Sequence, residues 1–313
     1  MITAVIPDLA YDQTVPRDLL HRWSLSEVFL TGYARVDEER FACAAQLPLS
    51  HGYFRDHVAA AAWHDPLNVL EAGRQAMTYA AHVHQGAPRA TAFMVRSWRL
   101  EITDRAALAC GERPGELRVE GAVPQRRVRG GHLRRLLFEL DLVLDGRALG
   151  HLSMDIGCTP AEQYLVLRRM QRGAEIATAF ALPAGPAGTP VHPSAVDKHD
   201  PRNVVLDGAR IEEGALGAVL SPRTFRNRSM YDHPYDHVPA MVLSEAARQC
   251  AFLLSGKDPG GRVVLRLDGR FDRFAEVDAP VELTTTTLPE PGSFRMAAAQ
   301  GGAVVASIDL ALG

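Results

Sequence analysis

The chain has 313 residues, of which 47% are hydrophobic and 23% charged, an ordinary globular composition that is long enough for two domains of roughly 150 residues each. The formal net charge of -3 gives no overall positive field, so we expect no nucleic-acid partner. No run of about 18 apolar residues predicts a membrane span, and the first residues lack the features of a secretion signal, so we expect a cytoplasmic protein without a membrane partner.

The first predicted helix begins at Pro66, with Asp65 as its N-cap, and ends before Gly86. It is apolar on most sides, which is typical of a helix buried inside a domain. Unpaired charges are costly in such a helix, so its polar groups must pair or face a wet cavity. These groups are three or four residues apart and therefore share one stripe of the helix: Glu71, Arg74, Gln75, Thr78 and His82.

Strands and a further helix are predicted after this first helix. The further helix covers residues 160–172 and begins with the capping-box pattern Thr159-Pro160-Ala161-Glu162. An arginine-rich stretch at 126–135 is the densest basic feature of the chain. It indicates either a docking surface for an acidic partner or a charged strand edge that keeps the protein soluble. The predicted strands are 92–100, 117–123, 136–144 and 151–156.

A repeated pattern organises the rest of the chain. Glu-Ala-x-Arg-Gln, found at residues 71–75, recurs at 245–249 in a second apolar helix that starts near Pro239 and ends before Gly256. Matching segments that are separated by nearly the same number of residues predict a duplicated domain. Two shorter segments upstream of each helix match at nearly the same offset, 20–22 with 196–198 and 28–30 with 204–206.

One apolar helix followed by antiparallel strands, twice over, predicts an α+β fold of the tandem (double) hotdog type, in which each sheet wraps around a long helix. The second set of strands is expected at 263–267, 281–287, 293–298 and 303–310. We expect an N-terminal hotdog domain with the extra helix at 1–180, a linker at 181–190 and a C-terminal hotdog domain at 191–313. A fused pair already supplies the dimer of single hotdogs, so a monomer and a homodimer both stay open.

Segments in both halves resemble the A-factor biosynthesis hotdog family, the γ-butyrolactone hormone synthases. The resemblance implies an acyltransferase that joins a β-ketoacyl group, delivered by an acyl carrier protein, to the hydroxyl of dihydroxyacetone phosphate. It further implies a place in the biosynthesis of a γ-butyrolactone, butenolide or furan signalling molecule. The residues that carry it are Val15-Pro16-Arg17, His21-Arg22, Glu27-Val28-Phe29-Leu30-Thr31, His64-Asp65-Pro66, Glu71, Arg74-Gln75, Asp236-His237-Val238-Pro239 and Glu245.

Acyl transfer to an alcohol requires a base, donors for the thioester oxyanion and a cationic seat for the phosphate. The base is expected to have a pKa raised by the apolar helix around it. The alternative is a structural Glu/Arg ion pair within each helix, in which the two charges only neutralise each other. The matched pairs supply the candidates: Glu245 or Glu71 as the base, Arg248 and Arg74 as phosphate ligands, and Gln249 and Gln75 to orient the carboxylates or the thioester carbonyl.

Histidines near the two helix starts are further candidates. His237 could act as an acid or base, and His64 could do the same or bind substrate, although a capping or packing role fits each as well. Cys250 could be a nucleophile, but Ala76 at the equivalent position favours a small core residue. The four cysteines are widely spaced and no metal-binding spacing occurs, so neither a metal nor another cofactor is expected.

Two other functions fit the same fold. A hotdog dehydratase or thioesterase would act on acyl thioesters without an alcohol acceptor, and a non-catalytic module would bind an acyl ligand unchanged. The arginine beside the glutamate in both copies favours the transferase, because hydrolysis and dehydration need no phosphate seat.

Overall fold

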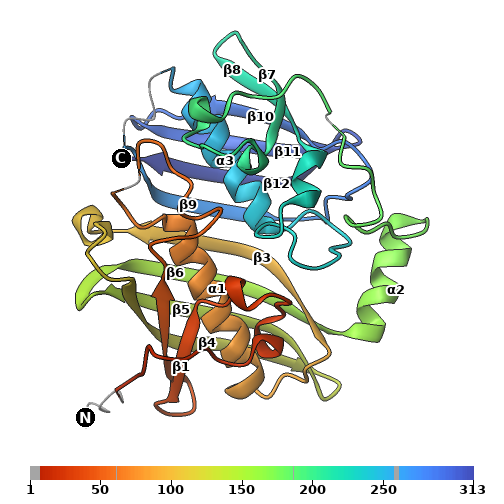
Figure 1. Cartoon of the computed structure of the whole chain (residues 1–313). Helices are drawn as coiled ribbons and strands as arrows, with labels where there is room; N and C mark the ends of the chain where they lie inside the picture. Colours follow the sequence, from red (N-terminus) through yellow and green to blue (C-terminus); the bar gives the residue numbers. More distant parts are fainter. Residues whose placement is uncertain (1–7, 61, 186, 257–260) are drawn as a thin grey trace. The chain divides into compact units, whose positions relative to one another are not determined.

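The computed structural model describes residues 8–60, 62–185, 187–256 and 261–313, and these form two compact units (Figure 1). Unit 1 contains the described residues of 1–49 and 68–176, and unit 2 contains those of 50–67 and 177–313. Residues 50–60 and 62–67 therefore pack with the second unit, although most of them precede the first long helix in the sequence.

In unit 1 a sheet of antiparallel strands has the order β1-β2-β4-β5-β6-β3. Helix α1, Pro66–Val83, has nearly all its side chains buried. Gly73 allows its close approach to the sheet, because a Cβ at this position would lie 2.2 Å from the Leu152 side chain. The strands are β1 Leu30–Arg35, β2 Arg40–Leu47, β3 Thr91–Ile102, β4 Gly115–Arg129, β5 His132–Leu144 and β6 Arg147–Pro160.

Unit 2 repeats this plan with the strand order β9-β12-β11-β10-β8-β7. Helix α3, Ala240–Leu254, packs against every strand of this sheet, and its residues 242–252 are buried. The strands are β7 Leu206–Glu212, β8 Ala215–Leu220, β9 Val264–Phe271, β10 Glu282–Thr287, β11 Ser293–Gln300 and β12 Ala303–Leu312.

The duplication extends to the short helices that precede each first strand. The 3-10 helices η1, Arg17–Leu20, and η4, Pro193–Val196, stand at equivalent places, as do η2, Leu25–Glu27, and η5, Pro201–Asn203. His21 and Asp197 end η1 and η4 with the same left-handed backbone, at φ angles of 54° and 58°. The matching upstream segments predicted from the sequence are therefore equivalent in structure as well.

The predicted long helices and the predicted strands are present, whereas β1, β2, β7 and β8 were not predicted. Asp65 caps α1 as expected, since its Oδ1 accepts a hydrogen bond of 2.9 Å from the Leu67 amide. The predicted capping box is wrong, because Thr159 still belongs to β6 and helix α2, Ala161–Arg172, follows Pro160 without a side-chain cap. No helix of the described chain is long and apolar enough to cross a membrane.

Candidate active site

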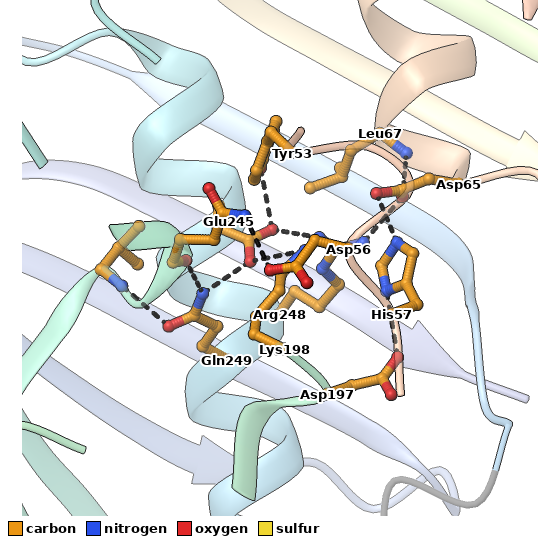
Figure 2. A network of polar contacts seen from close by, with 12 residues as sticks. Tyr53, Asp56, His57, Asp65, Leu67, Asp197, Lys198, Glu245, Arg248 and Gln249 are labelled. Carbon is orange, nitrogen blue, oxygen red and sulfur yellow. Dashed lines mark hydrogen bonds and ion pairs between the residues drawn. The ribbon is translucent and has the colours of Figure 1, made fainter. Parts of the chain in front are cut away.

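Glu245, on the buried face of α3, lies at the centre of a network of polar side chains in unit 2 (Figure 2). Its Oε1 accepts a hydrogen bond of 2.6 Å from Gln249 Nε2, and its Oε2 accepts one of 3.0 Å from the Tyr53 hydroxyl. Arg248 Nη2 donates to the same Oε2. Burial and the Glu245 carboxylate raise the pKa of Tyr53 well above its ordinary value, so this phenol stays a proton donor.

Arg248 bridges two buried carboxylates, because its Nη1 also donates to Asp65 Oδ1 over 2.7 Å. Burial alone would raise the pKa of Asp65, but Arg248 and His57 outweigh burial and hold that pKa well below its ordinary value. Burial alone would lower the pKa of Arg248, and Asp65 and Glu245 raise it instead. The Arg248 guanidinium is therefore fixed as a cation between two anions.

His57 joins this pair to a third carboxylate. Its Nε2 lies 3.0 Å from Asp65 Oδ2, and its Nδ1 lies 3.0 Å from Asp197 Oδ2. Both ring nitrogens of His57 therefore face carboxylate oxygens. Asp197 is fixed in turn by the Ala59 amide, which donates to its Oδ1 over 2.6 Å. A chain of contacts thus runs from Asp197 through His57, Asp65 and Arg248 to Glu245.

Lys198 adds a buried amine beside the same glutamate. Its Nζ lies 3.8 Å from Glu245 Oε1 and 4.8 Å from the centroid of the Tyr53 ring. Within the described chain, Nζ has no hydrogen-bond partner. Burial lowers the pKa of Lys198, although the Glu245 carboxylate opposes this effect.

The equivalent glutamate of unit 1, Glu71, is held by two guanidinium groups. Arg22 Nη2 donates to it over 2.5 Å, Arg74 donates through Nε and Nη2 over 2.7 and 2.8 Å, and Gln75 Nε2 donates over 2.8 Å. Burial alone would raise the pKa of Glu71, but Arg22 and Arg74 outweigh burial and lower the pKa to about 2. The expected rise in pKa is therefore wrong for Glu71, because a second arginine from outside the helix neutralises the carboxylate.

The two glutamines occupy matched positions with matched contacts. Gln75 Oε1 accepts from the Phe29 amide over 2.9 Å, and its Nε2 donates to the Glu27 carbonyl over 2.7 Å. Gln249 makes the same pair of bonds, with the Val205 amide at 3.0 Å and the Asn203 carbonyl at 2.8 Å. Each glutamine therefore ties the segment before the first strand of its unit to the central helix, besides donating to the glutamate.

The two sites differ in what surrounds the glutamate. Arg22 and Lys198 occupy matched positions in the repeat, but Arg22 bonds to Glu71 directly, whereas Lys198 stays 3.8 Å from Glu245. Tyr53 gives Glu245 a neutral donor from the 50–67 segment. Glu245 is consequently the less tightly neutralised carboxylate of the two.

The other predicted residues lie as follows. Arg74 is the most exposed cation at either glutamate, with 18% of its side chain exposed. His237 Nδ1 lies 2.6 Å from Asp236 Oδ1, and its ring packs edge-on against Phe274. Burial raises the pKa of Cys250 to about 12, so its thiol stays protonated and is poorly suited to act as a nucleophile. Among the described residues no group of three His, Cys, Asp or Glu side chains could hold a metal ion.

A small pocket in unit 2 reaches the polar network. Arg248 connects the pocket to Glu245, because it lines the pocket beside Asp65 and also donates to Glu245 Oε2. The pocket carries basic groups, acidic groups and aromatic rings, and its lining is His57, Ala60, Trp63, His64, Asp65, Pro66, Asp197, Arg248, Phe252, Arg262 and Val263.

Sequence reasoning missed several members of this network. Asp197 and Lys198 lay inside a matched segment of the repeat, which was a usable signal. Asp65 was recognised as a helix cap and as part of the family resemblance, but not as a partner of Arg248. Tyr53 and His57 gave no signal in the sequence, because neither belongs to the repeated pattern. Both reach the site because their segment packs with unit 2.

The chain matches the A-factor biosynthesis hotdog domain over residues 7–160 and 182–312. It is 32% identical over 277 residues to a 2-oxo-3-(phosphooxy)propyl 3-oxoalkanoate synthase of Streptomyces virginiae, a match that covers 88% of both chains. A relative with the same name from Streptomyces coelicolor is 30% identical over 287 residues, covering 89% of this chain and 84% of the relative. The dehydratase domain from the CurF module of curacin polyketide synthase, at 10% identity, shares the fold with a TM-score of 0.53 over 91% of this chain and 98% of that one. These matches show that the chain belongs to the A-factor biosynthesis hotdog family and has its α+β tandem hotdog fold.

Proposed function

We propose that this protein is an acyltransferase that condenses a 3-oxoacyl (β-ketoacyl) group from an acyl carrier protein with the hydroxyl of dihydroxyacetone phosphate. The relatives' name, 2-oxo-3-(phosphooxy)propyl 3-oxoalkanoate synthase, describes the ester that this reaction forms. The product would lead to a γ-butyrolactone, butenolide or furan signalling molecule. The observation that carries the proposal for this chain is the buried Glu245, held by Arg248 and Gln249 beside a pocket.

The reaction needs a group that accepts the hydroxyl proton and groups that stabilise the negative charge on the tetrahedral oxyanion. The acceptor hydroxyl attacks the thioester carbonyl, the base takes the hydroxyl proton, and the tetrahedral oxyanion collapses to expel the thiolate of the carrier. The proton then passes from the base to this thiolate, so the base is regenerated. A carboxylate that is ionised in the resting enzyme is suited to this cycle.

Glu245 is the base in this proposal, and Glu71 has a structural role in unit 1. Glu71 receives four hydrogen bonds, three of them from two guanidinium groups, and a pKa of about 2 makes it a weak proton acceptor. Glu245 receives a single guanidinium bond, with the remaining bonds from a neutral amide and a neutral phenol. Glu245 is therefore bonded to fewer cationic donors than Glu71.

Access to Glu245 is controlled by the 50–67 segment. Glu245 is fully buried, and the segment covers it with Tyr53 and ties Asp65 to Arg248. In this proposal substrates reach the carboxylate when this segment moves aside, and its return would exclude water while the thioester reacts.

The phosphate of the acceptor would bind beside Arg248 once the 50–67 segment moves, because the pocket of the resting structure has room for only about one water molecule. Arg248 is already paired with two carboxylates, so it cannot neutralise a phosphate alone. Arg262 and His64 line the same pocket and would supply the additional positive charge and hydrogen-bond donors.

Product analysis tests the proposal directly. Purified protein is incubated with a 3-oxoacyl carrier-protein thioester, with and without dihydroxyacetone phosphate, and the products are identified by mass spectrometry. Formation of the phosphorylated ester only in the presence of the acceptor would support the proposal. Thiol release at the same rate without the acceptor would show a thioesterase, and unchanged substrates would show a binding module.

A pair of matched variants tests the choice of base. Glu245→Gln should abolish ester formation in protein that remains folded by circular dichroism, since the amide keeps the shape but cannot accept the proton. Glu71→Gln should retain most of the turnover of the folded fraction. The reverse pattern would assign the base to Glu71.

A further inference from the structure

Helix α2 carries a row of apolar side chains that stay exposed. Val166, Leu167 and Met170 are 56%, 43% and 78% exposed, and together with Gln163 they have the three- and four-residue spacing that places side chains on one helix face. Contiguous exposed apolar side chains of this size are typical of interaction sites. A need for solubility does not explain these side chains, because exposed apolar groups do not favour solubility.

The hairpin of β4 and β5 carries free positive charge. Arg126, Arg127 and Arg129 are exposed, and in the part of the chain that the structure describes none of them forms an ion pair. Arg135, in contrast, lies opposite Arg127 and is neutralised by two hydrogen bonds to Asp155 of 2.7 and 2.6 Å. The three arginines lie close together in sequence at the end of β4, next to the glycine turn of the hairpin.

One hydrogen bond joins the two features within unit 1. Arg134 Nη1, on the same hairpin, donates to Gln163 Oε1 of α2 over 2.7 Å. Gln163 belongs to the exposed face of α2, so the apolar row of α2 begins next to Arg134 of the hairpin. We call the combined patch the docking surface, and its members are Arg126, Arg127, Arg129, Val166, Leu167 and Met170.

We propose that the docking surface binds the acidic carrier protein that delivers the 3-oxoacyl group, an inference that rests on the proposed function. An apolar centre beside unpaired guanidinium groups is complementary to a small protein that displays carboxylates around an apolar patch. A second copy of this chain fits less well, because the like charges of the two surfaces would repel each other. Protection of a strand edge would explain the arginines, but it leaves the apolar row of α2 without a cause.

The test compares a carrier-bound donor with a small one. In the triple variant Arg126→Glu/Arg127→Glu/Arg129→Glu, kcat/KM with a 3-oxoacyl carrier protein of type II fatty-acid synthesis should fall roughly tenfold or more, mainly through KM. The rate with the N-acetylcysteamine thioester of the same acyl group should stay unchanged, because that donor carries no protein. A second variant, Val166→Ser/Met170→Ser, should show the same selective loss without a change in net charge.

A matched control reverses three exposed arginines elsewhere, Arg113→Glu/Arg210→Glu/Arg273→Glu, and should leave both donors unaffected. An equal loss with both donors, or the same loss in this control, would overturn the docking surface. Fluorescence anisotropy with labelled holo carrier protein measures binding independently of turnover. If the wild type transfers from neither donor, the proposed function fails, and the docking surface still stands or falls on whether the triple variant weakens this binding.

Discussion

The clearest consequence of the unit 1 site concerns Glu71, which holds two arginines in a buried position. In Glu71→Gln the side chain keeps its size and one carbonyl acceptor, but its negative charge is lost. Arg22 and Arg74 then remain close together without a counter-charge, and Arg22 is almost completely buried. We expect this variant to be strongly destabilised although no side-chain volume is removed from the core.

The magnitude follows from the pKa of the carboxyl group. A fall from 4.5 to about 2 corresponds to about 3 kcal/mol of stability, at about 1.36 kcal/mol for each pH unit. Because the pKa is depressed in the folded state, this stability is fully present above pH 4.5. It disappears as the pH falls from 4.5 towards 2, where the unfolded chain binds the proton first. The variant lacks this carboxyl group and therefore lacks this part of the pH dependence.

Urea unfolding followed by circular dichroism measures both effects. At pH 7 the variant should be less stable than the wild type by about 3 kcal/mol, and this difference should shrink as the pH is lowered below 4.5. Glu290→Gln is the matched control, since Glu290 forms an exposed pair with Arg266 and should leave the midpoint unchanged. A Glu71→Gln protein as stable as the wild type at pH 7, or a difference that does not depend on pH, would refute the reasoning.

Three further outcomes are expected. Tyr53→Phe removes the phenolic donor to Glu245, so kcat should fall roughly tenfold while the circular dichroism spectrum stays unchanged; an unaffected kcat would contradict the role of this contact. His57→Gln leaves two buried carboxylates without their shared donor and should lower the thermal midpoint by several degrees, which scanning calorimetry would measure; an unchanged midpoint would disprove the bridge. Cys250→Ala should retain full turnover in the ester-forming assay, because a thiol whose pKa is raised to about 12 is not the nucleophile, whereas complete loss of activity in folded protein would show otherwise.

The sequence by itself determined the plan of the molecule. The repeated Glu-Ala-x-Arg-Gln pattern, the apolar helices around it and the alternating strands that follow are local signals, and they predicted the duplication, the tandem hotdog fold and the family. They also marked the glutamate, arginine and glutamine of each copy. Such features depend on residues a few positions apart, where helix and strand geometry dictates which side chains share a face.

Only the tertiary structure decided how the two copies differ. Arg22 is 49 residues from Glu71 and Tyr53 is 192 residues from Glu245, distances at which no spacing rule predicts contact. The 50–67 segment packs with unit 2 and so brings Tyr53, His57 and Asp65 to the site of that unit. The basicity of a buried carboxylate depends on how many charged donors surround it, and those donors are chosen by the packing of distant segments. The same helical pattern can therefore produce a neutralised glutamate in one copy and a candidate base in the other.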